Sequence, residues 1–297
     1  MIIEAISAYI NMMYRWRLGV DGGLMKVCVI GNGGREHALA WRLSISPSVT
    51  KVYAIPGSAA MSDCAELVGI DWQQSDHLIN FLKDNQVDLV VVGPEAPLVA
   101  GLADELNKAG IPVFGPSKAA AQLEGSKVFA KDLMKKYNIP TAAYGVFHNV
   151  EEAKAFIATT GAPIVVKADG LAAGKGVVVA MTIDEANAAV EDMLSGNRFG
   201  EAGSTVVIEE FMEGEEASLL AFVDGKTIVP MIASQDHKRI FDGDKGPNTG
   251  GMGTYAPAPV LTDALRDEAM KTILEPMVAA MQKEGMPYVG CLYAGLM

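Results

Sequence analysis

Four short apolar runs, rich in β-branched residues, alternate with helix-forming stretches in the first part of the chain. The runs lie at residues 27–30, 52–55, 89–92 and 113–114, and the expected helices lie at 38–43, 77–85 and 102–109. Strands that alternate with helices through short connections favour a parallel sheet covered on both faces. The sequence therefore predicts an α/β fold whose first unit, a doubly wound parallel sheet, ends near Leu123.

The rest of the chain has a different pattern. After an expected helix at 127–137, strands at 164–167 and 177–180 flank a loop rich in Gly and Ala, and a helix is expected at 184–194. Strands at 206–209 and 218–223 follow, and Asp224-Gly225 is a strong hairpin signal leading into 227–232. We expect a long polar loop over 233–253, a helix over 263–284 interrupted by Pro276, and a last strand at 290–296. This pattern predicts an α+β unit.

Composition narrows the class of function. With 24 Lys and Arg against 36 Asp and Glu, the formal net charge of −12 disfavours nucleic-acid binding. No apolar run approaches the roughly 18 residues that span a membrane. The three cysteines form no CxxC pair, which fits a reducing, cytoplasmic compartment. Residues 1–24 resemble neither a signal nor a transit peptide, and we interpret them as an extension outside the fold.

Two glycine-containing loops follow predicted parallel strands. The first is Gly31-Asn-Gly-Gly-Arg-Glu-His37, whose Gly33 and Gly34 let a ligand approach the backbone at the start of a helix. Glu36 occupies the third glycine slot of the dinucleotide fingerprint, so a dinucleotide is disfavoured. The second is Gly93-Pro-Glu-Ala-Pro-Leu98, in which the prolines stiffen the loop that holds Glu95. Tight turns without any ligand remain the alternative for both loops.

A third Gly-rich loop joins two strands in the second part of the chain. It contains Lys167, Gly170, Gly174, Lys175 and Gly176. It is not a Walker A loop, because no Ser or Thr follows Lys175 and a strand, rather than a helix, comes next. Lysines in this setting favour a flexible flap over a triphosphate, and the alternative is a plain surface turn.

Two acidic or polar stretches complete the set. The strand at 206–209 ends in Glu209, Glu210, Phe211 and Met212, and Glu216 follows. The residues suit a purine and a ribose, although on charge alone a solvated acidic loop is favoured. The stretch over 233–253 offers Asp236, Lys238 and Arg239 and is too polar and Gly-rich for packing, which suits a zwitterionic or phosphorylated substrate.

In this order, the motifs GNGGREH, GPEAPL, ADGLAAGKG, EEF with EEAS, QDHKR and PNTGGMG resemble the ATP-grasp enzymes, and within them the phosphoribosylamine–glycine ligase family. The resemblance spans residues 25–297. It implies an N-terminal substrate-binding (pre-ATP-grasp) domain at 25–124 and an ATP-grasp domain at 125–297. That second domain would be incomplete, and the family's C-terminal domain would be absent.

The resemblance also implies an activity. The family is an ATP-dependent carbon–nitrogen ligase of purine biosynthesis that joins glycine to 5-phosphoribosylamine through a glycyl phosphate, releasing ADP and phosphate. ATP with Mg²⁺ or Mn²⁺ is the implied cofactor set, and a monomer without nucleic-acid or membrane partners is expected. In the family the metal ligands, a Glu and an Asn, lie on a strand that would follow Met297. We therefore expect this chain alone to be inactive, which an ATP- and glycine-dependent phosphate-release assay tests.

Residue roles carry over onto matching positions. Nucleotide contacts are implied for Lys127, Lys167, Gly170, Gly174, Lys175, Gly176, Glu209, Glu210, Phe211, Met212 and Glu216. Phosphoribosylamine contacts are implied for Gly33, Gly34, Arg35, Glu36, Gly93, Pro94, Glu95 and Ala96. The amino-acid and acyl-transfer site is implied for Asp236, Lys238, Arg239, Asn248, Thr249, Gly250, Gly251 and Met252, and Lys167 would share the catalytic role.

Three alternatives stay open at this point. A sister ATP-grasp ligase would act on another carboxylate, and substrate profiling separates it. A dinucleotide-binding oxidoreductase is suggested by the first unit alone, and binding of a nicotinamide cofactor tests it. A non-catalytic nucleotide-binding protein would bind ATP without turnover.

Overall fold

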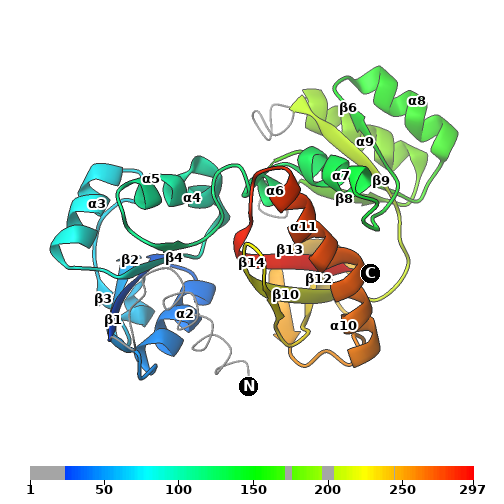
Figure 1. Cartoon of the computed structure of the whole chain (residues 1–297). Coiled ribbons are helices and arrows are strands. Elements are labelled where there is room, and N and C mark those ends of the chain that lie inside the picture. The colour runs from blue at the N-terminus through cyan, green and yellow to red at the C-terminus, as the bar shows by residue number, and fades with distance from the viewer. Residues whose placement is uncertain (1–23, 171–175, 196–203, 244) are drawn as a thin grey trace. The chain divides into compact units, whose positions relative to one another are not determined.

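The computed structural model describes residues 24–170, 176–195, 204–243 and 245–297. These residues form two compact units (Figure 1). The first unit contains the described residues up to Ala121 together with Ala221–Met231 and Met281–Leu292, and the second contains Gln122–Leu220, Ile232–Ala280 and Tyr293–Met297.

The first unit is built on a five-stranded parallel sheet. Its strands are β1 (Met25–Gly31), β2 (Val49–Pro56), β3 (Glu66–Leu67), β4 (Leu89–Val92) and β5 (Val113–Phe114), in the order β3-β2-β1-β4-β5. The connections contain α2 (Gly34–Ser44), a 3₁₀ turn at Ala59–Met61, α3 (Ser75–Asp84), α4 (Glu95–Ala100) and α5 (Leu102–Lys108). The predicted doubly wound sheet is confirmed.

Alternate residues of the central strands fill two separate cores. Cys28 and Ile30 of β1 pack with Leu78 of α3 and Leu106 of α5, whereas Val29 packs on the opposite face with α2. Figure 1 shows α3 and α5 on one side of this sheet and α2 on the other. A parallel sheet buried on both faces needs nearly continuous apolar strands, which explains why these runs do not alternate with polar residues.

The second unit contains a four-stranded antiparallel sheet. Its strands are β6 (Tyr144–Phe147), β7 (Ile164–Ala168), β8 (Val177–Ala180) and β9 (Val206–Glu210), in the order β6-β9-β7-β8. Helices α8 (Val150–Thr160) and α9 (Ile183–Ser195) cover one face of this sheet. There Ile157 and Val190 of the helices pack with Val166 and Ile208 of the strands. Helices α6 (Gln122–Gly125) and α7 (Lys127–Lys136) precede the sheet in sequence. The expected α+β character is confirmed.

A further three-stranded sheet has the order β11-β10-β14, formed by β10 (Ala217–Asp224), β11 (Ile228–Pro230) and β14 (Val289–Leu296). Strands β10 and β11 pair antiparallel, with Val223 opposite Ile228. The hairpin predicted from Asp224-Gly225 is confirmed, and the Asp224 carboxylate accepts the backbone N–H groups of Lys226 and Thr227 in the turn.

The prediction of a long loop over 233–253 is wrong. Strands β12 (Gln235–Phe241) and β13 (Lys245–Tyr255) form an antiparallel hairpin in which Gln235 lies opposite Tyr255. The polar and Gly-rich composition gave no strand signal in the sequence. The two strands pair through their backbones, and many of their side chains remain outside a core. The register shifts twice, between His237 and Arg239 and between Arg239 and Phe241, which accommodates the irregular sequence.

One smaller prediction also needs correction. The stiff loop expected at 93–98 is a helix from Glu95 onward, because Pro94 takes the N-cap position and Pro97 falls in the first turn, where a missing N–H costs little. The interruption expected near Pro276 in the helix at 263–284 is confirmed. The chain passes from α10 (Asp263–Ala269) through a π turn (Met270–Leu274) into α11 (Glu275–Lys283), whose second residue is Pro276.

Candidate functional site

The two glycine loops of the first unit meet around one buried carboxylate. They follow β1 and β4, which are neighbours in the parallel sheet, so both loops lie at its carboxyl edge. Glu36, in the first turn of α2, is only 3% exposed, and its Oε2 accepts the backbone N–H of Gly33 at 2.8 Å. This contact is one half of a capping box at the N-terminus of α2, because Gly33 has no side chain with which to cap the helix in return.

Glu36 explains why glycines surround it. A Cβ atom built on Gly31, Gly33 or Gly93 would lie 2.5, 2.9 or 2.2 Å from atoms of the Glu36 side chain. Gly31 also has a φ of +125°, which other residues rarely adopt. The glycines thus have a reason inside the protein, in addition to the ligand approach for which the sequence suggested them.

Arg35 links the two loops. Its Nε donates to Glu36 Oε1 at 2.7 Å and its Nη1 donates to Glu95 Oε1 at 2.8 Å. Burial acts to lower the pKa of Arg35, but the hydrogen bonds to Glu95 and Glu36 outweigh it and raise that pKa. Burial acts to raise the pKa of Glu95, and the hydrogen bond from Arg35 overcomes it, so the pKa falls. We call Gly31, Gly33, Arg35, Glu36, Gly93 and Glu95 the glycine-loop site; Gly34 begins α2, and Pro94 and Ala96 flank Glu95.

A second group of charges lies on the sheet face opposite α8 and α9. In β7 and β9, Val166 and Ile208 face the core with those helices, so their neighbours Lys167 and Glu209 face the other way. Lys167 lies opposite Val207 and Glu209 lies opposite Val165, which makes Lys167 and Glu209 diagonal neighbours. Lys167 Nζ donates to Glu209 Oε2 at 2.9 Å.

A lysine from α7 joins this pair. Lys131 Nζ lies 3.0 Å from the same Glu209 Oε2 and donates to Thr141 Oγ1 at 2.8 Å. The side chains of Lys131 and Glu209 are 10% and 6% exposed. Burial acts to lower the pKa of Lys131 below its usual value, against the opposing effect of Glu209.

The N-terminus of α7 is held by Asp169, just after β7. The Asp169 carboxylate accepts the backbone N–H groups of Lys127 at 2.6 Å and Val128 at 3.2 Å, and Ser126 caps the helix from its own side chain. Lys127 Nζ donates to the Gly170 carbonyl at 2.9 Å. Burial lowers the pKa of Lys127, which Asp169 and Glu209 partly offset and Lys167 reinforces.

We call Lys127, Lys131, Lys167, Asp169 and Glu209 the lysine site. The sequence predicted Lys127, Lys167 and Glu209, and the structure brings them together. It missed Lys131 and Asp169. A signal for Lys131 existed, because it lies among the apolar residues of α7 and one turn after Lys127, where a lysine needs a partner.

The Gly-rich loop between β7 and β8 is described only at its ends. Gly170 has a φ of +86°, and the backbone N–H of Ala168 donates to the Gly176 carbonyl at 2.8 Å. Gly174 and Lys175 lie outside the described residues. The flap over a triphosphate stays a prediction.

The acidic residues after β9 divide into two groups. Glu210 ends β9, where its Oε2 accepts the Ala143 N–H at 3.2 Å, and Phe211 and Met212 follow it. Glu216 instead pairs with the Lys238 ammonium at 2.9 Å. The proposed nucleotide roles of these residues stay predictions.

Strand β12 carries the remaining charged candidates. Lys238 lies 3.3 Å from Asp236 as well as near Glu216. Burial acts to lower the pKa of Lys238, and Glu216 with Asp236 overcomes it, so the pKa rises. Arg239 lies opposite Asn248 on β13, and Thr249 donates to the Lys238 carbonyl. Gly250, Gly251 and Met252 continue β13, with Gly251 at a φ of +123°.

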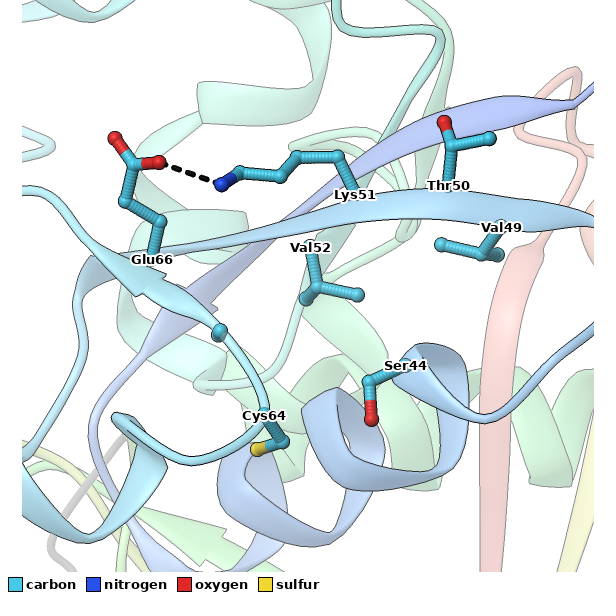
Figure 2. A pocket seen from close by; sticks show the side chains of 8 residues that line it. Ser44, Val49, Thr50, Lys51, Val52, Cys64 and Glu66 are labelled. Carbon is cyan, nitrogen blue, oxygen red and sulfur yellow. Dashed lines mark ion pairs between the residues drawn. The ribbon is translucent and has the colours of Figure 1, made fainter.

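A pocket of about 220 Å³ also lies in the first unit (Figure 2). It is lined by Ser44, Val49, Thr50, Lys51, Val52, Cys64, Ala65 and Glu66, and Lys51 pairs with Glu66 at 2.7 Å. Its lining comes largely from the start of β2 and from the segment that leads into β3. Ligands of open α/β sheets bind at the carboxyl ends of the strands, so we assign no function to this pocket.

Metal ligation was the remaining expectation. Within the described ranges, no three His, Cys, Asp or Glu side chains group as they would around a metal ion. The expectation that the ligands follow Met297 stays a prediction. No helix of the described part of the chain is long and apolar enough to cross a membrane.

Comparison with protein families gives two matches. Residues 25–124 match the model of the phosphoribosylglycinamide synthetase N domain, and residues 125–297 match that of the phosphoribosylglycinamide synthetase ATP-grasp (A) domain. A phosphoribosylamine–glycine ligase from Brucella melitensis is 59% identical over 273 residues, and one from Halalkalibacterium halodurans is 55% identical over 273 residues. Both alignments cover 92% of this chain, and the chain spans about 64% of the length of these relatives.

Solved structures agree with this match. A phosphoribosylamine–glycine ligase from Thermotoga maritima superposes with a TM-score of 0.80 at 34% identity, covering 92% of this chain and 65% of that one. A biotin carboxylase from Campylobacter jejuni superposes with a TM-score of 0.69 at 16% identity, covering 92% of this chain and 62% of that one. The second likeness concerns the fold alone.

Proposed function

The chain belongs to the phosphoribosylglycinamide synthetase family, and we propose that it serves the ATP-dependent ligation of glycine to 5-phosphoribosylamine. The lysine site is the observation that carries this proposal. The ammonium groups of Lys131 and Lys167 share Glu209 Oε2. The Lys127 ammonium donates to the Gly170 carbonyl and is close enough to Lys167 for that charge to lower its pKa. Three ammonium groups are thus concentrated in one place in a chain whose net charge is −12, and such a cluster is what capture of a polyphosphate requires.

The chemistry follows from the substrates. A glycine carboxylate oxygen attacks the γ-phosphorus of ATP, ADP leaves, and a glycyl phosphate forms. The ribosylamine nitrogen then attacks the glycyl carbonyl carbon, phosphate leaves, and the amide of glycinamide ribonucleotide results. Phosphoryl transfer asks mainly for positioning and charge neutralisation, and Lys127 and Lys167 supply both at the phosphates.

We propose that the glycine-loop site takes the phosphoribosylamine. Its fixed carboxylate, Glu95, suits an amine or a sugar hydroxyl, both of which donate hydrogen bonds. The strand β12 residues Asp236, Lys238 and Arg239, together with 248–252, are proposed for the amino-acid and acyl-transfer step. Mg²⁺ or Mn²⁺ would accompany the nucleotide and neutralise phosphate charge. A cytoplasmic monomer is proposed, which the three free cysteines fit.

Calorimetric titration with ATP tests the nucleotide part of the proposal. We expect ATP to bind the purified chain saturably and to bind the Lys127→Ala and Lys167→Ala variants more weakly. NAD should not compete with ATP. Phosphate release that depends on ATP, glycine and phosphoribosylamine tests the reaction. Binding without turnover is the outcome expected of this chain alone, and turnover with another carboxylate would favour a sister ligase. Absence of ATP binding would refute the proposal.

A further inference from the structure

Glu209 is shared between two lysines that are held very differently. The same oxygen, Oε2, accepts Lys167 at 2.9 Å and contacts Lys131 at 3.0 Å. Lys131 is 10% exposed, whereas Lys167 is 27% exposed. A single carboxylate therefore holds one buried and one partly accessible ammonium group.

Lys131 has several anchors besides Glu209. Its ammonium donates to Thr141 Oγ1 at 2.8 Å and to the Ala142 carbonyl at 3.4 Å, and it lies 5.6 Å from the centre of the Tyr144 ring. Tyr144 is in turn fixed by donating to Asp132 at 2.7 Å. This set of contacts keeps Lys131 in place whether or not a ligand is present.

Glu209 and a bound polyphosphate would compete for the ammonium group of Lys167. This ammonium has three N–H donors, but Glu209 competes with a phosphate for its charge, so a tight contact to Glu209 weakens its attraction for the phosphate. Leaving a buried carboxylate such as Glu209 without a partner is strongly unfavourable, because the charge has lost its water. A second, permanent cation beside Glu209 removes that obstacle.

We propose that Lys131 is a positioning residue that neutralises Glu209 permanently, so that Lys167 is free to exchange Glu209 for an anionic polyphosphate ligand. This inference rests on the proposed nucleotide function of the site. Lys131 itself does not touch the ligand, since its ammonium is buried and already engaged with Glu209, Thr141 and Ala142.

A double-mutant cycle on Lys131 and Glu209 tests the proposal. The variants are Lys131→Met, Glu209→Gln and the double variant, with Lys131→Arg as the conservative variant and Lys135→Met as a control on an exposed lysine of the same helix. The probes are ATP and inorganic tripolyphosphate, titrated calorimetrically. Tripolyphosphate lacks a base, so any contact of Glu209 with adenine does not enter its affinity.

We expect Lys131→Met to weaken tripolyphosphate and ATP binding by roughly tenfold or more, because Glu209 then retains Lys167. In the Glu209→Gln background the same substitution should change tripolyphosphate affinity by less than about threefold. Glu209→Gln alone should bind tripolyphosphate at least as tightly as the unmodified chain. Lys131→Arg and Lys135→Met should bind like the unmodified chain.

Other outcomes overturn the proposal in distinguishable ways. If Lys131→Met weakens binding equally in both backgrounds, Lys131 contacts the phosphates directly. If Lys131→Met binds normally, Lys167 needs no second cation. If Lys131→Met alone fails to fold, the comparison of Glu209→Gln with the double variant, which lacks both charges, still tests the proposal. A tenfold difference in tripolyphosphate affinity between these two variants refutes it. If the unmodified chain binds neither probe, the proposed nucleotide function itself has failed.

Discussion

Each unit of the molecule buries a glutamate, but the two glutamates differ in the charged groups that surround them. Glu36 in the glycine-loop site is satisfied by the Gly33 N–H and by Arg35, whose other end is occupied by Glu95. Two carboxylates there share one guanidinium. Glu209 in the lysine site is surrounded by an excess of ammonium groups. The second arrangement is the converse of the first, because two cations share one carboxylate.

The difference shows what each region is able to attract. Glycines in the first region are required by the volume of Glu36, so glycine content there reflects packing as well as ligand approach. An excess carboxylate favours ligand groups that donate hydrogen bonds, whereas the surplus ammonium of the lysine site favours phosphates. We therefore expect substitutions in the first region to change stability first, and substitutions in the second to change nucleotide affinity first.

Gly93→Ala should give the largest effect. A Cβ there would lie 2.2 Å from Glu36 Oε1 and 2.5 Å from its Cγ, so the buried Glu36 side chain must move. Overpacking of this kind costs roughly 1–3 kcal/mol of unfolding free energy. Chemical denaturation measures the loss, and ATP affinity should stay unchanged. Gly34→Ala is the matched control, because a Cβ there meets nothing within 4 Å.

The Glu36→Ala/Gly93→Ala double variant sharpens this test. If the Glu36 side chain is what excludes a Cβ at Gly93, adding Gly93→Ala to Glu36→Ala should cost much less than adding it to the unmodified chain. Equal costs in both backgrounds would show that the backbone, rather than Glu36, requires the glycine.

Lys167→Ala should show the reverse behaviour. Loss of a charge-assisted contact to a phosphate weakens ATP binding by roughly tenfold, or about 1.4 kcal/mol. Calorimetry measures the change, and unfolding free energy should move little because Glu209 keeps Lys131. A large loss of stability with unchanged ATP affinity would assign Lys167 to the structure instead.

The pH dependence of ATP affinity distinguishes Lys127 from an ordinary lysine. Burial lowers the pKa of Lys127, and only its ammonium form favours the phosphates. Affinity is therefore complete at low pH and is lost as pH rises through that lowered pKa, earlier than for a lysine at its usual value. Lys127→Arg, which stays charged, should shift this loss to higher pH in titrations between about pH 7 and 10. An unchanged profile would contradict the assignment.

Sequence patterns gave the parallel sheet reliably because both of its faces are apolar, as in β1 and β4. Lys167 and Glu209 lie in strong strands, but the role of Glu209 was implied only by the family resemblance, since charge alone favoured a solvated acidic loop. Sequence patterns failed for β12 and β13, whose pairing is satisfied by the backbone and leaves little trace in the side chains. Lys131 escaped notice because its partner, Glu209, is 78 positions away in sequence, and only the packing of α7 on the sheet joins them.

The smallest expected effect concerns Cys28, whose rate of reaction with thiol reagents reports whether the first unit is folded. It is completely buried in the core beside β4, and burial raises the pKa of its thiol, so little thiolate forms at neutral pH. We expect Cys28 to resist thiol reagents until the first unit unfolds, whereas Cys64, which is half-buried, should react sooner. Mass spectrometry of labelled peptides separates the two. Because Gly93→Ala disturbs the glycine-loop site at the end of β4, it should accelerate Cys28 labelling, while Lys167→Ala in the second unit should not. Equal labelling rates in both variants would contradict the separation between the two regions.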